Sequence, residues 1–123
     1  MSKKILVVDD IKFIVEYELE MLETLSRELS EKFEIDTAGS VSEAIGKISS
    51  ELYDAVIVDM HLPDGMGVEI AKAAREKQKD VRIAVMTISP YDDEIHRSLF
   101  DLFLKKPVPP HIYIEHIRKL LTA

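Results

Sequence analysis

The sequence predicts one α/β domain over residues 1–123, a doubly wound (βα)5 parallel sheet with helices on both faces. Strand-like and helix-like stretches alternate five times, which is typical of doubly wound sheets. Most strand-like runs are short and apolar without interruption, as in strands that are covered on both faces. With 46% hydrophobic and 32% charged residues, the 123-residue chain has the composition of one globular domain. The expected strands span residues 4–8, 34–38, 54–58, 82–86 and 101–104.

A helix is expected after each strand. In the first and longest, one apolar face recurs at steps of three and four. Ser40 is expected to cap the second helix, and Gly65 and Gly67 lead into the third. Ser89 and Pro90 are expected to cap and begin a shorter fourth helix. The apolar faces of the first and fifth helices comprise, respectively, Ile14, Tyr17, Met21, Leu22, Leu25 and Leu29, and Tyr113, Ile117, Leu120 and Leu121.

Composition excludes several functions. A formal net charge of −7 and a pI near 5.1 argue against direct binding to nucleic acid or to an anionic membrane, because the phosphates would repel the protein. The chain has no cysteine, which excludes disulfides and thiolate chemistry. Only four apolar residues separate Lys4 from Asp9, too few for a signal peptide or a membrane span. A cytoplasmic location is expected.

Three carboxylates are expected at one edge of the sheet. Asp9 and Asp10 follow the first strand, and Asp59 ends the third. Because ligands of open α/β sheets bind outside the carboxyl ends of the strands, and because clustered carboxylates repel one another, this pattern predicts a divalent metal site. Thr87 and Lys106 end two further strands at the same edge.

These residues resemble, in order, the markers of the receiver domain of two-component response regulators, the CheY-like superfamily. The markers are Asp9-Asp10, Asp59 with His61-Leu62-Pro63-Asp64-Gly65 behind it, Thr87, and Lys106-Pro107. The resemblance covers essentially the whole chain. It implies a flavodoxin-like sandwich with the strand order 2-1-3-4-5.

The resemblance also implies roles for the site residues. Asp59 is the expected phosphoacceptor. Mg²⁺, for which Mn²⁺ can substitute, is expected on the carboxylates of Asp10 and Asp59 and the backbone carbonyl of His61, with Asp9 bound through water. Thr87 and Lys106 are expected to hold the phosphoryl oxygens. The bond between Lys106 and Pro107 is expected to be cis, and Thr87 and Phe103 to form a conformational switch.

The chain departs from the family pattern after the threonine. Ile88 stands where a small residue is usual, so we expect it to narrow access to the phosphoryl site; alternatively it points into the core beneath the fourth helix. The segment from Thr87 to Lys106 is short and lacks the usual Gly-Ala pair, which predicts a fourth helix about one turn shorter than usual. Phe103 is either the switch residue or plain core.

The expected function is a signalling switch rather than an enzyme, with chemistry confined to its own Asp59. The donor would be a sensor histidine kinase or a phosphotransfer protein, and the target an unknown protein. We expect a monomer or a phosphorylation-dependent dimer that acts alone, relays the phosphoryl group or forms part of a larger regulator. Two alternatives are a phosphorylation-independent interaction module and a Mg²⁺-dependent phosphohydrolase with Asp59 as nucleophile and His61 as general acid.

Overall fold

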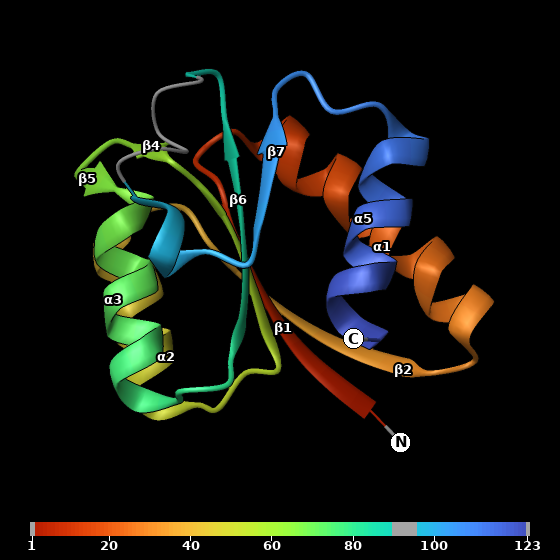
Figure 1. Ribbon diagram of the computed structural model, residues 1–123, viewed down its shortest axis with the longest axis horizontal. Coiled ribbons are helices and arrows are strands. Elements are labelled where there is room, and N and C mark those ends of the chain that lie inside the picture. Colours follow the sequence, from red (N-terminus) through yellow and green to blue (C-terminus); the bar gives the residue numbers. More distant parts are fainter. Residues whose placement is uncertain (1, 90–95, 123) are drawn as a thin grey trace.

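A computed structural model describes residues 2–89 and 96–122 and contains a five-stranded parallel sheet (Figure 1). The spatial order β2-β1-β3-β6-β7 is the predicted order 2-1-3-4-5, because these are the five sheet strands counted along the chain. The predicted fold is therefore confirmed. The strands are β1 (Ser2–Val8), β2 (Lys32–Ala38), β3 (Ala55–Asp59), β6 (Arg82–Thr87) and β7 (Leu102–Lys105).

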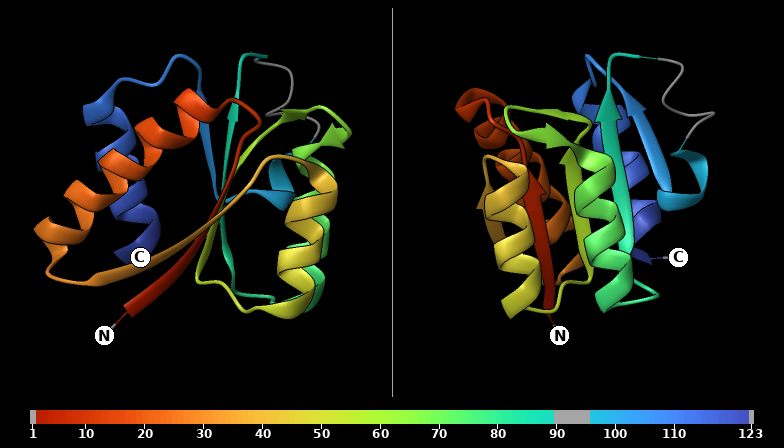
Figure 2. Two further views of the ribbon diagram at one scale, coloured as in Figure 1. Left: turned by 180° about the vertical axis from the view of Figure 1, so that it is seen from behind. Right: turned by 90° about the vertical axis from the view of Figure 1, so that its left-hand side faces the viewer.

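Helices cover both faces of the sheet (Figure 2). Helices α1 (Lys12–Leu29) and α5 (Pro110–Thr122) pack on one face, and α2 (Val41–Ser50) and α3 (Gly67–Lys77) on the other. This arrangement brings the carboxyl ends of all five strands to one edge, at the top of Figure 1. Among the described residues, no helix has both the length and the apolar character needed to cross a membrane.

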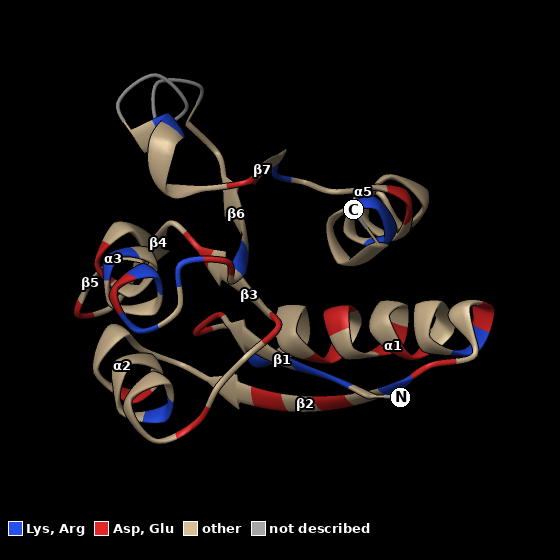
Figure 3. Ribbon diagram, turned by 60° about the horizontal axis from the view of Figure 1, so that its bottom comes forward, with Lys and Arg blue, Asp and Glu red and all other residues tan. Residues whose placement is uncertain are grey.

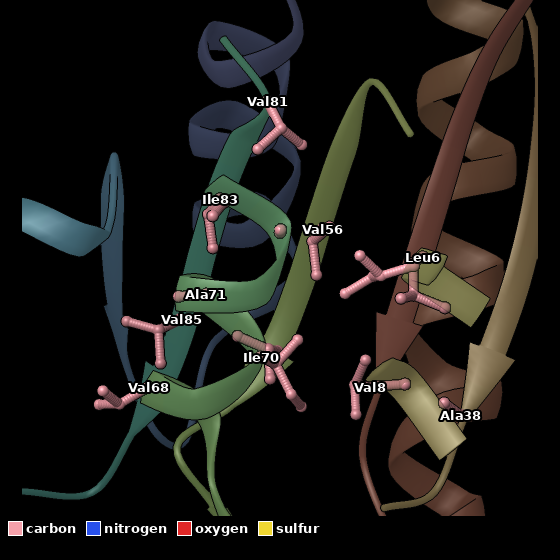
Figure 4. Close-up of a cluster of buried hydrophobic side chains, with 14 of the residues drawn as sticks. Leu6, Val8, Ala38, Val56, Val68, Ile70, Ala71, Val81, Ile83 and Val85 are labelled. Atoms are coloured by element: carbon pink, nitrogen blue, oxygen red, sulfur yellow. The ribbon is translucent and has the colours of Figure 1, made fainter. Parts of the chain in front are cut away.

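The sheet divides the core into two layers. Along each buried strand, successive side chains point to opposite faces. Leu6, Val56 and Val85 project toward α3 and α2, as Figure 4 shows for one layer. Ile5 and Ile57 project toward α1 and α5. Uninterrupted apolar runs are required because helices cover both faces.

Capping confirms part of the local interpretation. The Ser40 side chain accepts a hydrogen bond from the backbone N–H of Glu43 at 3.1 Å, as predicted for a capping residue. The Asp64 carboxylate accepts from the N–H groups of Val41 and Ser42 at 2.7 and 3.0 Å. These two bonds lower the pKa of Asp64. They also tie the loop that follows β3 to the first turn of α2.

Three short features differ from expectation. Strands β4 (His61–Leu62) and β5 (Gly65–Met66) form a small antiparallel hairpin after β3, and a 3₁₀ turn, η1 (Arg97–Leu99), precedes β7. Pieces of two or three residues show no periodicity in a sequence, so they were not predicted. The predicted start of the fourth helix at Pro90 lies outside the described residues. The buried face predicted for α5 is confirmed at all four positions. That of α1 is confirmed at Met21, Leu22 and Leu25, while the other three predicted residues are half-buried.

Candidate functional site

The three predicted carboxylates meet at the carboxyl edge of the sheet. Strands β1 and β3 are parallel neighbours, so Asp9 and Asp10, which follow β1, come close to Asp59, the last residue of β3. One carboxylate oxygen from each residue lies within 4.8 Å of the others. Asp9 and Asp59 are buried, whereas Asp10 is exposed. Within residues 2–89 and 96–122, this is the only cluster of three His, Cys, Asp or Glu residues that is close enough to share a metal ion.

Lys106 supplies the opposing charge. Its Nζ lies 2.9 Å from Oδ2 of Asp59 and 3.5 Å from Oδ2 of Asp9. The residue follows β7, and its peptide bond to Pro107 is cis. Burial alone lowers the pKa of Lys106, but the hydrogen bond to Asp59 and the charges of both aspartates outweigh it and raise the pKa. The ammonium group therefore stays protonated beside the two carboxylates.

Asp9 shows how costly this concentration of acid is. Burial raises the pKa of Asp9, and the charge of Asp59 raises it further. A hydrogen bond from the backbone N–H of Ile11, at 2.9 Å, and the charge of Lys106 oppose that rise. One ammonium thus faces two buried carboxylates and an exposed third, which leaves the edge with excess negative charge.

Basic and acidic residues are shown in Figure 3, where acidic residues also recur along α1 and β2.

The backbone behind Asp59 is closely packed. The N–H of Gly67 donates to the carbonyl oxygen of Met60 at 2.8 Å. A Cβ atom at Gly67 would lie only 2.7 Å from the carbonyl oxygen of Asp59, so only glycine lets α3 begin this close to the site. The backbone N–H of His61 donates to Oδ1 of Asp59 at 3.3 Å. The His61 residue is otherwise exposed.

Thr87 lies at the same edge, at the end of β6 next to β3. Its side chain is buried, and its Oγ1 accepts a hydrogen bond from the backbone N–H of Ser89 at 3.1 Å. Its carbonyl oxygen accepts from the backbone N–H of Lys106 at 2.9 Å. Ile88 is 68% exposed, so the alternative that it points into the core is wrong. The alternation of the strand turns Thr87 inward and Ile88 outward.

Phe103 is half-buried in β7. Its ring packs edge to face against Phe100, with the centroids 5.3 Å apart, and it contacts the core layer beneath α2 and α3. Both the switch role and the plain core role are compatible with this position, so the switch role stays a prediction.

The donor set fits Mg²⁺. Magnesium prefers oxygen ligands and is usually bound by one or two carboxylates together with water. Asp10 is exposed and Asp59 lies beside it, which leaves room for water at the cluster. The residues that the sequence predicted as carboxylate ligands are therefore together in space.

A sequence profile of the response regulator receiver domain matches residues 5–118. The chain belongs to this family. A putative transcriptional regulator of Haloferax volcanii is 32% identical over 75% of this receiver domain and 16% of its own length. The regulatory protein PhoP of Bacillus subtilis is 29% identical over 98% of this chain and 49% of its own length. The receiver domain thus spans less than half of these curated relatives.

Solved structures agree with the fold. The response regulator TrrA of Thermotoga maritima, in complex with Mg²⁺ and BeF, is 36% identical, covers 97% of this chain and 99% of its own, and has a TM-score of 0.72. A CheY-like receiver domain of Methanospirillum hungatei is 27% identical, covers 98% and 94%, and has a TM-score of 0.83. The acidic cluster of this receiver domain fits Mg²⁺, the ion that the TrrA structure contains.

Sequence reasoning missed one buried acid of this receiver domain. Glu18 on α1 is only 1% exposed, and the Tyr113 hydroxyl on α5 donates to its Oε1 at 2.8 Å. Glu18 lies four positions after Ile14 and four before Leu22, so it lies on the apolar face of α1. That spacing was the available signal, but a single Glu in an apolar stripe of a glutamate-rich helix is easily assigned to the solvent side.

Proposed function

We propose that this receiver domain is a phosphoacceptor switch in which Asp59 takes a phosphoryl group from a sensor histidine kinase or a phosphotransfer protein. The observation that carries the proposal is the environment of Asp59. Its carboxylate lies 2.9 Å from the Lys106 ammonium and within 4.8 Å of Asp9 and Asp10. A structural ion pair needs one acid, whereas phosphoryl transfer needs a nucleophile, a metal cradle and a cation together.

The chemistry follows from these groups. An oxygen of Asp59 attacks phosphorus and forms a P–O bond, while the bond from phosphorus to the donor breaks and the leaving group takes the electron pair and a proton. The product is an acyl phosphate on Asp59. The Lys106 ammonium would pair with a phosphoryl oxygen, and the Thr87 hydroxyl would donate to another.

We assign the metal to the carboxylates of Asp10 and Asp59 and the backbone carbonyl of His61, with Asp9 acting through water; Mn²⁺ would substitute for Mg²⁺. A bound divalent ion would neutralise charge on the phosphoryl oxygens. Asp9 suits an indirect role because its side chain is already engaged by Ile11 and Lys106. Asp10 suits a direct role because it is exposed.

The readout would begin at Thr87 and Phe103. Movement of Thr87 toward a phosphoryl group would break its hydrogen bond with the Ser89 N–H and alter the loop after β6. Phe103, which has no hydroxyl group, could respond only by repacking against Phe100. Ile88, the exposed first residue of this loop, would restrict access and slow loading from small donors or hydrolysis of the acyl phosphate.

The deciding experiment is labelling with acetyl phosphate and Mg²⁺, read by intact-protein mass spectrometry. We expect wild type to gain the mass of one phosphoryl group and Asp59→Asn to gain none. Asp80→Asn is the matched control, because Asp80 is an exposed aspartate in the turn before β6, and it should label like wild type.

Three results would overturn the proposal. Equal labelling of wild type and Asp59→Asn would place the acceptor elsewhere. No labelling together with no response to a fluoroberyllate salt would favour the interaction module that works without phosphorylation. Turnover of an aryl phosphate that is lost in Asp59→Asn would instead establish the phosphohydrolase.

A further inference from the structure

A buried hydrogen bond joins the first halves of α1 and α5. Glu18 and Tyr113 are each 1% exposed, and the Tyr113 hydroxyl donates to Oε1 of Glu18 at 2.8 Å. The other side-chain hydrogen bond between these helices in the described part of the chain runs from Arg118 to Glu28, in their second halves, where both side chains are partly exposed. The two helices are therefore tied inside the core only by the Glu18–Tyr113 bond, among the residues that the structure describes.

Packing does not explain why this position of α1 carries an acid. Glu18 lies on the apolar face of the helix, where a leucine would fill a similar volume. Burial raises its pKa to about 8, so the carboxyl group is neutral at neutral pH, and its Oε2 has no hydrogen-bond partner among the described residues. Burial of a polar group that is only partly paired costs stability. In return, a hydrogen bond is directional, so it fixes the placement of α5 on α1 more narrowly than apolar contacts do.

Helix α1 is tied to the acidic cluster. It begins at Lys12, directly after its N-cap Ile11. The Asp9 carboxylate accepts a hydrogen bond from the backbone N–H of Ile11 at 2.9 Å. The position of α1 is thus fixed relative to a buried acid of the site.

Helix α5 is tied to Lys106 by a stiff connection. Residues 106–110 read Lys-Pro-Val-Pro-Pro and lead from the end of β7 into the helix. Each proline fixes its own φ and restricts the residue before it, so none of these five residues rotates freely. The backbone N–H of Tyr113 donates to the carbonyl oxygen of Pro109 at 3.0 Å. A displacement of α5 is therefore passed on to Lys106.

Side-chain packing is incomplete around this connection. A cavity of about 580 Å³ is lined by Glu18 and Tyr113 and also by Lys106, Pro107 and Val108. On the side that faces the cavity, these residues have no packed neighbours to hold them in place. The hydrogen bond between the two helices thus acts where apolar contacts are few.

We propose that Glu18 and Tyr113 are positioning residues, whose hydrogen bond fixes α5 against α1 and thereby holds the Lys106 ammonium beside the acidic cluster. The contacts form a closed path. It runs from Asp9 through α1 to the buried pair, and through α5 and its connection back to Lys106, whose Nζ lies 3.5 Å from Asp9 and 2.9 Å from Asp59. The consequence for phosphoryl transfer rests on the proposed function, whereas the placement of Lys106 does not.

The test removes both partners of the bond in the double variant Glu18→Leu/Tyr113→Phe. Replacing both partners by apolar groups of similar shape leaves stability nearly unchanged, and urea unfolding checks this. The first readout, in metal-free protein, is NMR of the Lys106 ammonium protons, whose exchange with water is slowed by their bonds to Asp59 and Asp9. We expect faster exchange in the double variant.

The second readout is the rate at which acetyl phosphate with Mg²⁺ labels Asp59, measured as a function of donor concentration. We expect the maximal rate constant of the double variant to fall by about tenfold to about a hundredfold. The half-saturating concentration should change much less, because Lys106 would act mainly on the phosphoryl group in the transition state.

Two single substitutions separate positioning from a general loosening of the helices. Glu18→Leu should resemble the double variant, and Glu18→Gln should restore both readouts toward wild type, because a glutamine carbonyl accepts from Tyr113 as the neutral carboxyl group does. Glu28→Leu is the matched control. It removes the other bond between α1 and α5 and should behave like wild type in both readouts.

Unchanged exchange of the Lys106 ammonium in the double variant would overturn the proposal, and so would an equal effect of Glu28→Leu. Faster exchange with an unchanged labelling rate would overturn the role in phosphoryl transfer. If wild type is not labelled at all, the proposed function fails, and the exchange measurement still decides whether the buried pair positions Lys106.

Discussion

Replacing Asp10 by asparagine is expected to stabilise the metal-free protein while weakening its response to Mg²⁺. Carboxylate oxygens of Asp10, Asp9 and Asp59 lie within 4.8 Å of one another, and two unit charges at that separation repel by about 0.9 kcal/mol even in water. Asp10 takes part in two such pairs, and we take the positive charge of Lys106, which pairs with Asp9 and Asp59, to offset about one of them. The free energy of unfolding should therefore rise by about 1 kcal/mol, or about 4 °C in Tm for a domain of this size.

Urea unfolding of wild type and Asp10→Asn, in EDTA and in a Mg²⁺ series, measures both effects. A ligand that binds only the folded state at 100 times its Kd adds about 2.7 kcal/mol, and we expect the variant to show a much smaller gain at the same concentration. Asp80→Asn changes the net charge by the same amount at a position remote in sequence from the cluster. It should neither raise the free energy of unfolding nor weaken the response to Mg²⁺. Lower stability of Asp10→Asn in EDTA, or an unchanged Mg²⁺ response, would refute the reasoning.

Three further predictions concern packing and buried polar groups. Gly67→Ala should lower the free energy of unfolding by about 1–3 kcal/mol through overpacking, whereas Gly46→Ala, with nothing within 4 Å of its added Cβ, should raise it by about 0.5–1 kcal/mol; urea unfolding measures both. Tyr113→Phe should destabilise by about 1–3 kcal/mol, because Glu18 loses its hydrogen bond; an unchanged urea midpoint would contradict this. Glu18 has a pKa of about 8 in the folded protein and of about 4.3 in the unfolded chain. Its protonated carboxyl group therefore makes its full contribution to stability below about pH 4.3, and this contribution is lost as the pH rises toward about 8. Glu18→Gln should flatten this decline in unfolding free energy between about pH 5 and 7.5, and an equally steep profile in the variant would show that another group titrates.

Much of the fold follows from local pattern. The apolar runs that became β1 and β3 are continuous because helices cover both faces of the sheet, and Ser40 caps α2 through a bond that spans three residues. Such interactions lie within a few residues of one another, so the sequence displays them. The β4–β5 hairpin and η1 are too short to display any pattern.

The sequence could predict which residues form the candidate site but not which of their atoms contact one another. Parallel strands end at one edge, so strand ends alone place Asp9, Asp10, Asp59, Thr87 and Lys106 there. The exposure of Ile88 depends on how β6 ends, and the interpretation of Ile88 as core was wrong for that reason. The burial of Glu18 depends on the packing of α5 against α1, two elements far apart in the chain.

The sequence by itself determined the doubly wound sheet, its strand order through the family resemblance, and the set of charged and hydroxyl groups at its carboxyl edge. The sheet and the groups at its edge follow from periodicity and from the rule that parallel strands share an edge, whereas the strand order is implied by the resemblance alone. Only the tertiary structure decided that Lys106 bridges Asp59 and Asp9, that α3 begins against the backbone of Asp59, and that Glu18 faces an apolar cavity. Such contacts join side chains from separate elements, and their distances are set by how those elements pack rather than by the residues near them in sequence.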